Sequence, residues 1–468
     1  MEKKKRNLFT SSIGFVLAAA GSAVGLGNIW RFPYLAAKDG GGLFLVVYLA
    51  LALTFGFALL TTEVAIGRKT KQSPLTAYYA LRPKKVWRGL GVIACLVPIL
   101  IMPYYCVIGG WVVKYFLAFL TGHGADAAKD DYFTGFITSE VEPIVLMVIF
   151  LLIVAFIIYR GVAGGIEMSS RLIMPVLLLL VIGIAIFSLT IHHTDENGVV
   201  RTGLQGLKVF VVPNLKGVTV HSFFTTVMDA MGQLFYSLSV AMGIMIAYGS
   251  YVPDKANLAF AINEIEVFDT VVAFLAGTMI IPAVYVFMGT EGMASGPSLM
   301  FVSLPKIFVS MGAIGNVIGT LFFAMVLFAA ITSAMSILEA VVASLIDQFH
   351  MSRKAAVISE SLFALVIAIV VCLGYNVWYF KYKLPNGTVG QILDVMDYVS
   401  NNVFMPIVAI ATCILIGWIL KPQLVIDEAE KGYRRMGRKG LYVVMIKYIA
   451  PILLLVLFLK SIGILTII

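Results

Sequence analysis

Long apolar runs alternate with short polar segments along the whole chain. Each run is long enough to cross the roughly 30 Å hydrocarbon core of a bilayer as one helix of about 20 residues. The pattern therefore predicts eleven membrane-spanning helices within a single transmembrane domain of residues 1–468. The predicted spans are 12–37, 42–67, 90–121, 142–160, 168–191, 220–250, 259–289, 314–348, 355–380, 390–421 and 441–467.

The composition supports an all-α polytopic membrane protein. Of 468 residues, 60% are hydrophobic and 13% are charged, and the mean hydropathy is +0.97. A soluble chain of this length would need a larger charged surface. The segment MEKKKRNLFTSS lacks a small-residue cleavage site, so we expect it to be retained. All cysteines lie within apolar runs and are expected to be unpaired core residues, namely Cys95, Cys106, Cys372 and Cys413.

The distribution of lysine and arginine indicates how the chain crosses the membrane. Cytoplasmic loops carry an excess of these residues. Most of them fall on the inner side when the N-terminus is cytoplasmic, and an odd number of spans then places the C-terminus outside. The net charge of +9 fits this topology and contact with anionic lipid better than a nucleic-acid site. We expect a multi-pass protein of the plasma membrane, and the sequence leaves its oligomeric state open.

Two of the predicted spans are interrupted by small and polar residues. The first breaks at GSAVGLGN (21–28), and the sixth breaks at SLSVAMG (237–243). Because the break recurs five spans later and five is odd, a second five-helix unit would be inverted in the membrane. The predicted repeats cover about 8–191 and about 220–421, followed by an extra helix at 441–467. Such paired breaks indicate a transporter's binding site, whereas the alternative is that the glycines only allow close helix packing.

The break near residues 21–28 has a physical rationale. Irregular backbone is tolerated at membrane depth only where it is buried in protein or lines a cavity. An unwound stretch frees carbonyl groups that hold a small cation, and the half-helix that follows directs free N–H groups at an anion. The same segment can therefore bind Na⁺ and a carboxylate together.

Five segments resemble motifs of the neurotransmitter:sodium symporter family and occur in the family's order: GSAVGLGNIWRFP, GGLFLVVYLA, PYYCVIGGW, GQLFYSLSVAMG and AAITSAMSILEA. The chain is most similar to the bacterial, amino-acid-transporting branch, from about residue 6 to the last span. The resemblance implies the leucine-transporter fold, with two inverted five-helix repeats and broken helices 1 and 6. It also implies Na⁺-driven uptake of an amino acid by alternating access.

The resemblance implies two sodium sites. The second site would use backbone carbonyls and hydroxyls of Gly21, Val24, Ala329, Thr332 and Ser333. Oxygen ligands without a carboxylate suit a hard monovalent ion. The alternative for the Thr332–Ser333 pair is that both hydroxyls bond to carbonyls of their own helix.

The first sodium site would use Ala23, Asn28, Ser237 and Asp269. Asp269 stands where many family members have asparagine, and a one-residue slip of the alignment would place Phe268 there, which cannot coordinate an ion. An ionisable group near mid-membrane is a functional hypothesis by default. The alternative is a structural aspartate held by neighbouring hydroxyls such as that of Thr270.

For the substrate, the resemblance implies a carboxylate site at the backbone of Gly25, Leu26 and Gly27 and at Tyr105. Monoamine transporters place an aspartate at the position of Gly25, where this chain leaves room for the substrate's own carboxylate. Met242 replaces a phenylalanine of some relatives, and its flexible thioether favours large hydrophobic or aromatic amino acids. The other expected substrate contacts are Ala23, Ile101, Tyr236, Ser237, Ser239, Ser333 and Ile337. Core packing is the alternative for the two isoleucines.

The resemblance also implies two gates formed by ion pairs. Arg31 would pair with Asp397 at the outer gate, and Arg6 would pair with Asp347 at the inner gate. The alternative for Arg6 is a plain positive-inside residue. The aromatic residues expected beside these gates are Tyr105 and Tyr236 outside and Phe9 and Tyr251 inside.

Chloride dependence is not expected. Chloride-dependent relatives bind the anion at positions that match Tyr48, Gln233, Ser237, Asp269 and Ala273. Here Asp269 supplies a built-in negative charge, while Ala273 lacks the hydroxyl that would complete the chloride site.

Three classes of function compete. A sodium-coupled amino-acid symporter is the favoured one. A proton-coupled permease of similar fold would replace the second sodium by a cationic side chain, and Thr332 and Ser333 argue against it. A membrane enzyme or sensor would need a catalytic cluster or a soluble domain. The sequence has no phosphate-binding G-x-x-x-x-G-K-[ST] motif and no H-E-x-x-H motif, so we do not expect an enzyme.

Overall fold

The computed structural model describes residues 8–194, 198–215, 217–292, 299–431 and 435–465, and most of these residues are helical. The α-helices are α1 (Ser12–Ala23), α2 (Phe32–Lys38), α3 (Gly42–Leu51), α4 (Phe57–Thr70), α5 (Pro74–Leu81), α6 (Lys85–Leu120), α7 (Gly124–Ala127), α8 (Tyr132–Ile137), α9 (Glu142–Tyr159), α10 (Met168–Thr190), α11 (Gly203–Val211), α12 (Val220–Ser237), α13 (Ile244–Ser250), α14 (Leu258–Gly292), α15 (Leu304–Ser310), α16 (Ala313–Phe349), α17 (Arg353–Leu373), α18 (Ile392–Asp397), α19 (Met405–Ile414), α20 (Gln423–Ala429), α21 (Lys439–Val444) and α22 (Ala450–Ser461).

Several spans contain wider π-helical turns, and two connecting segments form short antiparallel hairpins. The π-helical turns are η1 (Gly27–Arg31), η2 (Ala52–Gly56), η3 (Val162–Glu167), η4 (Leu299–Ser303), η5 (Tyr398–Phe404), η6 (Leu415–Ile419) and η7 (Met445–Ile449). The strands are β1 (His192–Thr194) paired with β2 (Val200–Thr202), and β3 (Tyr382–Lys383) paired with β4 (Val389–Gly390).

The described residues contain nine helices long and apolar enough to cross a membrane, or ten when the pair 12–23 and 27–38, bent by 48°, counts as one span. The predicted span 220–250 is not among them. It is divided between α12 and the seven-residue α13, and α12 carries polar residues among its apolar ones. A helix that borders a polar site needs less apolar surface than one surrounded by lipid.

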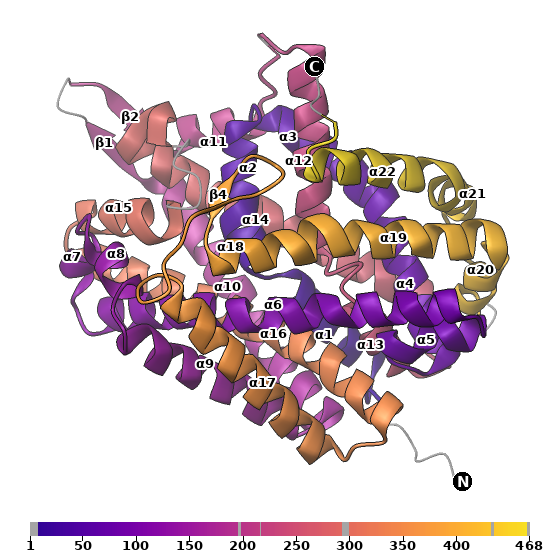
Figure 1. The fold of residues 1–468 in the computed structure, drawn as a ribbon. Coiled ribbons are helices and arrows are strands. Elements are labelled where there is room, and N and C mark those ends of the chain that lie inside the picture. Colours follow the sequence, from indigo (N-terminus) through magenta and orange to yellow (C-terminus); the bar gives the residue numbers. More distant parts are fainter. Residues whose placement is uncertain (1–7, 195–197, 216, 293–298, 432–434, 466–468) are drawn as a thin grey trace.

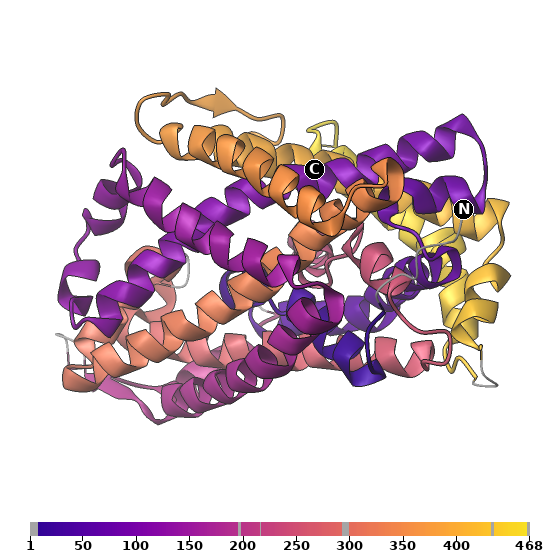
Figure 2. The same ribbon diagram turned by 90° about the horizontal axis from the view of Figure 1, so that it is seen from below.

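The broken helices lie in the interior of the helical assembly. Helix α1 contacts α14 and α16, and α13 packs against α4 and α16. The long helices α6 and α16 pack against each other, while α9 and α17 pack on α6 along one side of the molecule (Figures 1 and 2). This arrangement surrounds irregular backbone with protein, as its unpaired polar groups require.

All four cysteines are buried and free, which confirms the expectation that they are unpaired core residues.

Both predicted helix breaks occur in the structure. Helix α1 ends at Ala23, and helical structure resumes at Gly27. Helix α12 ends at Ser237, and residues 238–243 pass through left-handed backbone conformations, with φ of 52° at Ser239 and 61° at Ala241. Such angles are unfavourable for residues other than glycine. The buried Glu63 of α4 stabilises this conformation, because its Oε1 accepts the Ala241 N–H at 2.6 Å.

Candidate binding site between the two helix breaks

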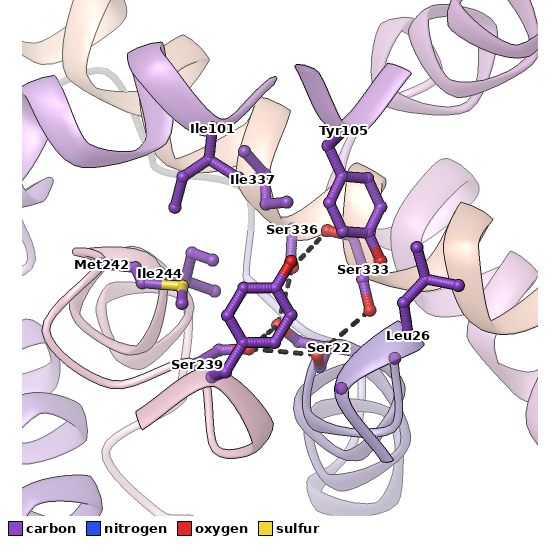
Figure 3. Close-up of a pocket in the computed structure, with 13 residues that line it drawn as sticks. Ser22, Leu26, Ile101, Tyr105, Ser239, Met242, Ile244, Ser333, Ser336 and Ile337 are labelled. Carbon is purple, nitrogen blue, oxygen red and sulfur yellow. Dashed lines mark hydrogen bonds between the residues drawn. The ribbon is translucent and has the colours of Figure 1, made fainter. Parts of the chain in front are cut away.

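A cavity lies where the two breaks meet α6 and α16 (Figure 3). The space among its lining residues, including the part open to solvent, is ≈ 320 Å³. Most of its lining residues are those predicted from sequence: Gly25, Leu26, Gly27, Ile101, Tyr105, Tyr236, Ser239, Met242, Ser333 and Ile337. Of the predicted substrate contacts, Ala23 and Ser237 do not line it.

Three further residues, Ser22, Ile244 and Ser336, line the cavity but were not predicted from sequence. Two of them carried a signal. Ser22 lies within the interrupted segment 21–28, and Ser336 follows Ser333 by three residues, which places the hydroxyls of Ser333 and Ser336 on one face of α16.

The cavity has one polar end. The Ser22 hydroxyl lies 2.6 Å from the Ser336 hydroxyl and donates to Ser239 Oγ at 3.0 Å. The Ser22 carbonyl accepts from Ser239 Oγ at 3.0 Å and from Ser333 Oγ at 3.3 Å (Figure 3). These bonds join the end of α1 to the second break and to α16. Four apolar side chains lie together at the other end, those of Ile101, Met242, Ile244 and Ile337, whereas Leu26 lies on the side of Ser333.

Tyr105 presents an unsatisfied hydroxyl at the polar end. The hydroxyl is buried and makes no hydrogen bond to any described residue, although Ser333 and the backbone of Leu26 lie close to it. A Cβ atom at Gly25 would lie 2.3 Å from Ser333 Oγ and 3.5 Å from the Tyr105 hydroxyl. A buried donor without a partner is unfavourable. The space left by Gly25 therefore suits a ligand that carries a hydrogen-bond acceptor.

The backbone at this point also favours an anion. Residues Gly27–Lys38 form continuous helical structure through η1 and α2. The N-terminus of this half-helix lies at Leu26 and Gly27, both of which line the cavity. The free N–H groups and the helix dipole at such an end bind carboxylates well.

A second polar cluster surrounds Asp269, which is fully buried on α14. Its Oδ1 accepts from Asn28 Nδ2 at 2.8 Å and from Ser237 Oγ at 2.5 Å, and its Oδ2 accepts from the Tyr48 hydroxyl at 3.1 Å. The neighbouring Phe268 is only partly buried and packs at the edge of the core. Asp269, rather than Phe268, therefore faces Asn28 and Ser237.

Among the described residues, the hydroxyls that reach this carboxylate come from Ser237 and Tyr48 rather than from Thr270. Ser237 Oγ also lies 2.8 Å from Asn28 Oδ1. Ala23 is the last residue of α1, just before the unwound stretch that leads to Asn28, and its carbonyl accepts the Gly25 N–H at 3.0 Å. One carboxylate with several neutral oxygens fits the ligand chemistry of a hard cation.

The predicted second sodium site lies between α1 and α16. A Cβ at Gly21 would lie 3.2 Å from Thr332 Cβ, so these two residues are in close contact. The Thr332 hydroxyl bonds to the Phe328 and Ala329 carbonyls of its own helix, at 3.1 and 3.0 Å. The carbonyl of Val24 belongs to the unwound stretch just after α1. The oxygens available here are all neutral, which suits a monovalent cation.

The predicted outer ion pair is not formed in the described structure. Asp397 accepts instead from the Tyr104 hydroxyl at 3.1 Å and from Asn401 Nδ2 at 2.6 Å. Arg31 is exposed, although it is close enough to Asp397 to act on it electrostatically. Both neutral donors bond to Oδ1 of the carboxylate, and the guanidinium is exposed to solvent, so a direct ion pair adds little stability.

At the inner end, Arg6 lies outside the described residues, so the predicted pair of Arg6 with Asp347 is not described. Asp347 Oδ2 accepts the Ser73 N–H at 2.6 Å. The expected aromatic contact is present, because the Phe9 N–H donates to the Tyr251 carbonyl at 3.1 Å and their ring centroids lie 6.2 Å apart.

Two further residues at the inner end, Glu339 and Arg353, were not predicted from sequence. The Tyr251 hydroxyl donates to Glu339 Oε1 at 2.7 Å, and Glu339 pairs with Arg353 at 2.5 Å. Glu339 is fully buried on α16. A carboxylate within the apolar run 314–348 was a signal for such a role.

The helical assembly and its buried cavity define the class of protein as a membrane transporter. The sequence profile described as "Sodium:neurotransmitter symporter family" matches residues 6–135 and 135–467. The chain belongs to this family, whose members are transporters rather than enzymes.

Relatives of known sequence and structure agree with this assignment. An uncharacterized sodium-dependent transporter, YhdH of Bacillus subtilis, is 31% identical over 100% of both chains. The sodium- and chloride-dependent GABA transporter 2 of Homo sapiens is 24% identical and covers 93% of this chain and 78% of its own. The crystal structure of MhsT in complex with L-phenylalanine has 33% sequence identity and a TM-score of 0.84, covering 98% of this chain and 100% of that one.

Proposed function

We propose that the protein is a Na⁺-coupled symporter that imports L-amino acids, preferentially large hydrophobic or aromatic ones, by alternating access. The observation that carries this proposal is the cavity between the two helix breaks. Its polar end has a buried tyrosine hydroxyl, without a hydrogen-bond partner among the described residues, beside a helix N-terminus, and its opposite end is apolar. This amphiphilic shape matches an amino acid, and MhsT is a relative solved with phenylalanine.

In this proposal the substrate carboxylate binds at Tyr105 and at the N–H groups of Leu26 and Gly27. The amino group meets carbonyls and hydroxyls around Ser22 and Ser239. The side chain occupies the apolar end, where Met242 adapts to bulky groups. Ala23 and Ser237 do not line the cavity; in this proposal they hold in place the neighbouring backbone that contacts the substrate.

Two Na⁺ ions are proposed as co-substrates. The first binds Ala23, Asn28, Ser237 and Asp269, and the second binds Gly21, Val24, Ala329, Thr332 and Ser333. Both proposed sites include residues of the first break, which also holds the substrate carboxylate. Ions and substrate therefore stabilise the same backbone conformation, and this shared stabilisation couples their binding.

The proposed architecture is eleven spans, with inverted repeats at about 8–191 and 220–421 and an extra helix at 441–467. The protein is proposed to lie in the plasma membrane with a cytoplasmic N-terminus and an extracellular C-terminus. In this orientation Phe9, Tyr251 and Glu339 close the cytoplasmic side, while the exposed Arg31 lies on the outer side. Changes in these contacts would alternate access to the cavity.

Uptake by purified protein in proteoliposomes tests this proposal. We expect an imposed inward Na⁺ gradient to drive accumulation of phenylalanine or leucine, with no accumulation when K⁺ replaces Na⁺. Accumulation driven by a proton gradient without Na⁺ would instead support the proton-coupled permease. A panel of radiolabelled amino acids ranks the substrates.

The second sodium site can be tested with the double variant Thr332→Val and Ser333→Ala. Removing two oxygen ligands leaves an underfilled shell, so we expect the apparent Na⁺ affinity to fall at least about tenfold, the scale of one lost polar contact. Thr320→Val is the matched control for Thr332→Val, because the Thr320 hydroxyl, like that of Thr332, bonds to a carbonyl of its own helix α16, here that of Asn316. If the double variant keeps the wild-type Na⁺ dependence of uptake, these residues do not bind Na⁺.

A further inference from the structure

A carboxylate-centred cluster joins the start of α1 to the start of α10, remote from the cavity. Glu167, the last residue of η3, is 2% exposed. Its Oε2 accepts the Thr10 N–H at 2.7 Å, and its Oε1 accepts the Thr10 hydroxyl at 2.5 Å. The Ser11 hydroxyl lies 3.4 Å from the same Oε1. The two residues that lead into α1, including its N-cap Ser11, thus dock on a single side chain of another span.

Arg171 completes the cluster from the first turn of α10. Its Nη2 lies 2.6 Å from Glu167 Oε1, 2.8 Å from Ser11 Oγ and 3.2 Å from Thr10 Oγ1. The Arg171 side chain is 49% exposed, whereas that of Glu167 is 2% exposed. Arg171 therefore remains as a hydrated counter-ion for Glu167 when the contacts to α1 are absent.

Glycines allow this close approach on both sides. A Cβ at Gly14, in the first turn of α1, would lie 2.0 Å from Glu167 Oε1, so only glycine lets the carboxylate lie against the helix. A Cβ at Gly165 would lie 2.0 Å from the Ile157 carbonyl of α9. This second contact holds η3 against α9, so that Glu167 projects from a fixed element toward α1.

The energetics favour a contact that opens and closes. When α1 moves away, Glu167 loses the Thr10 and Ser11 donors but keeps Arg171, and water replaces the lost bonds. The pair of Arg68 with Glu428 differs, because both side chains are 0% exposed and separation would leave the buried Arg68 guanidinium without its carboxylate. The first arrangement suits a switch, and the second suits a permanent link between α4 and α20.

We propose that Glu167 and Arg171 form a reversible latch with Thr10 and Ser11, which holds the cytoplasmic half of α1 closed and must open before the cavity reaches the cytoplasm. This inference rests on the proposed alternating-access function. The mechanical connection is direct, because α1 runs without interruption from Ser12 to Ala23 and ends at the cavity and the proposed sodium ligands. Glu167 is a positioning residue, since it touches neither ion nor substrate.

Hydrogen exchange of the full-length protein in lipid nanodiscs tests the latch. In Na⁺-free buffer, Glu167→Gln is expected to raise exchange of the amides in residues 9–16 at least about tenfold, the scale of losing a hydrogen bond to a charged group. Glu142→Gln is the matched control, because it weakens the exposed pair with Lys114 on the other side of the assembly. Equal exchange in wild type and Glu167→Gln would overturn the latch.

Gly14→Ala gives an independent measurement in a variant that keeps every latch residue. Alanine favours helix over glycine, so a purely structural effect would slow exchange in α1. The latch predicts the opposite, because the added Cβ displaces the Glu167 carboxylate. Slower exchange in residues 9–16 of Gly14→Ala would contradict the proposal.

Binding of radiolabelled phenylalanine distinguishes a failure of the latch proposal from a failure of the proposed symport function. In Glu167→Gln we expect the Na⁺ concentration for half-maximal binding to rise about tenfold, whereas the Kd at saturating Na⁺ stays within about twofold of wild type. A change in Kd without a change in Na⁺ dependence would overturn the latch. Na⁺-independent binding by the wild-type protein would overturn the proposed symport. The comparison of hydrogen exchange between wild type and Glu167→Gln would still test whether the latch exists.

Discussion

Gly25→Asp is expected to abolish amino-acid binding. The new Cβ would lie 2.3 Å from Ser333 Oγ, so the side chain must enter the space beside the Tyr105 hydroxyl, where the substrate carboxylate is proposed to bind. Two carboxylates in a poorly solvated cavity repel by several kcal/mol. We therefore expect the affinity for phenylalanine to fall at least about 100-fold, which corresponds to about 3 kcal/mol. Equilibrium binding of radiolabelled substrate in saturating Na⁺ measures this loss.

Gly25→Ala separates charge from size. It introduces the same close contact with Ser333 without a carboxylate, so we expect a smaller loss of affinity than in Gly25→Asp. If both variants lose the same affinity, the steric contact explains the effect and repulsion does not. If Gly25→Asp binds the amino acid within a few fold of wild type, the carboxylate site is elsewhere.

Asp269→Asn is expected to reduce Na⁺-driven uptake at least about 100-fold in chloride-free buffer. Asp269 supplies the negative charge beside Asn28 and Ser237, and removing it would leave Na⁺ uncompensated in a buried site. Breaking a buried charge pair in this way has an effect of about 3–5 kcal/mol. Wild-type uptake should be equal in chloride and in gluconate, because its counter-charge is covalently attached. Asp254→Asn, at an exposed carboxylate paired with Lys71, is the control and should leave uptake unchanged.

Adding Ala273→Ser to Asp269→Asn should restore uptake only when chloride is present. Residue 273 lies one turn beyond Asp269 on α14 and is fully buried. A hydroxyl there, with those of Tyr48 and Ser237, would provide donors for the anion. A sharp fall of wild-type uptake on chloride withdrawal would show that Asp269 does not balance the sodium charge.

The helix breaks and most of the cavity could be predicted from the sequence because their causes are local. Glycines and polar residues at 21–28 and 237–243 interrupt apolar runs, and backbone of this kind must line a protected site wherever it occurs in a membrane. The motifs around Gly25, Tyr105 and Ser333 then indicated which side chains surround the substrate. All three line the cavity.

Partners of charged residues were decided by the tertiary structure. The sequence shows that Arg31, Asp397 and Glu339 stand in or near apolar runs, but the distance between segments decides which groups meet. Asp397 bonds to Tyr104, a residue 293 positions away in the chain, instead of pairing with Arg31.

The contact between Glu167 and Thr10 spans 157 positions and depends on the missing side chain of Gly14. Nothing in the apolar pattern marks Gly14 as different from other small residues of α1. A hydrophobic pattern specifies which segments cross the membrane, because transfer of a segment into the hydrocarbon core depends on the length and side chains of that segment. Hydrogen bonds and ion pairs act over a few ångströms and depend on direction, so only the packed arrangement of the helices determines which of them form.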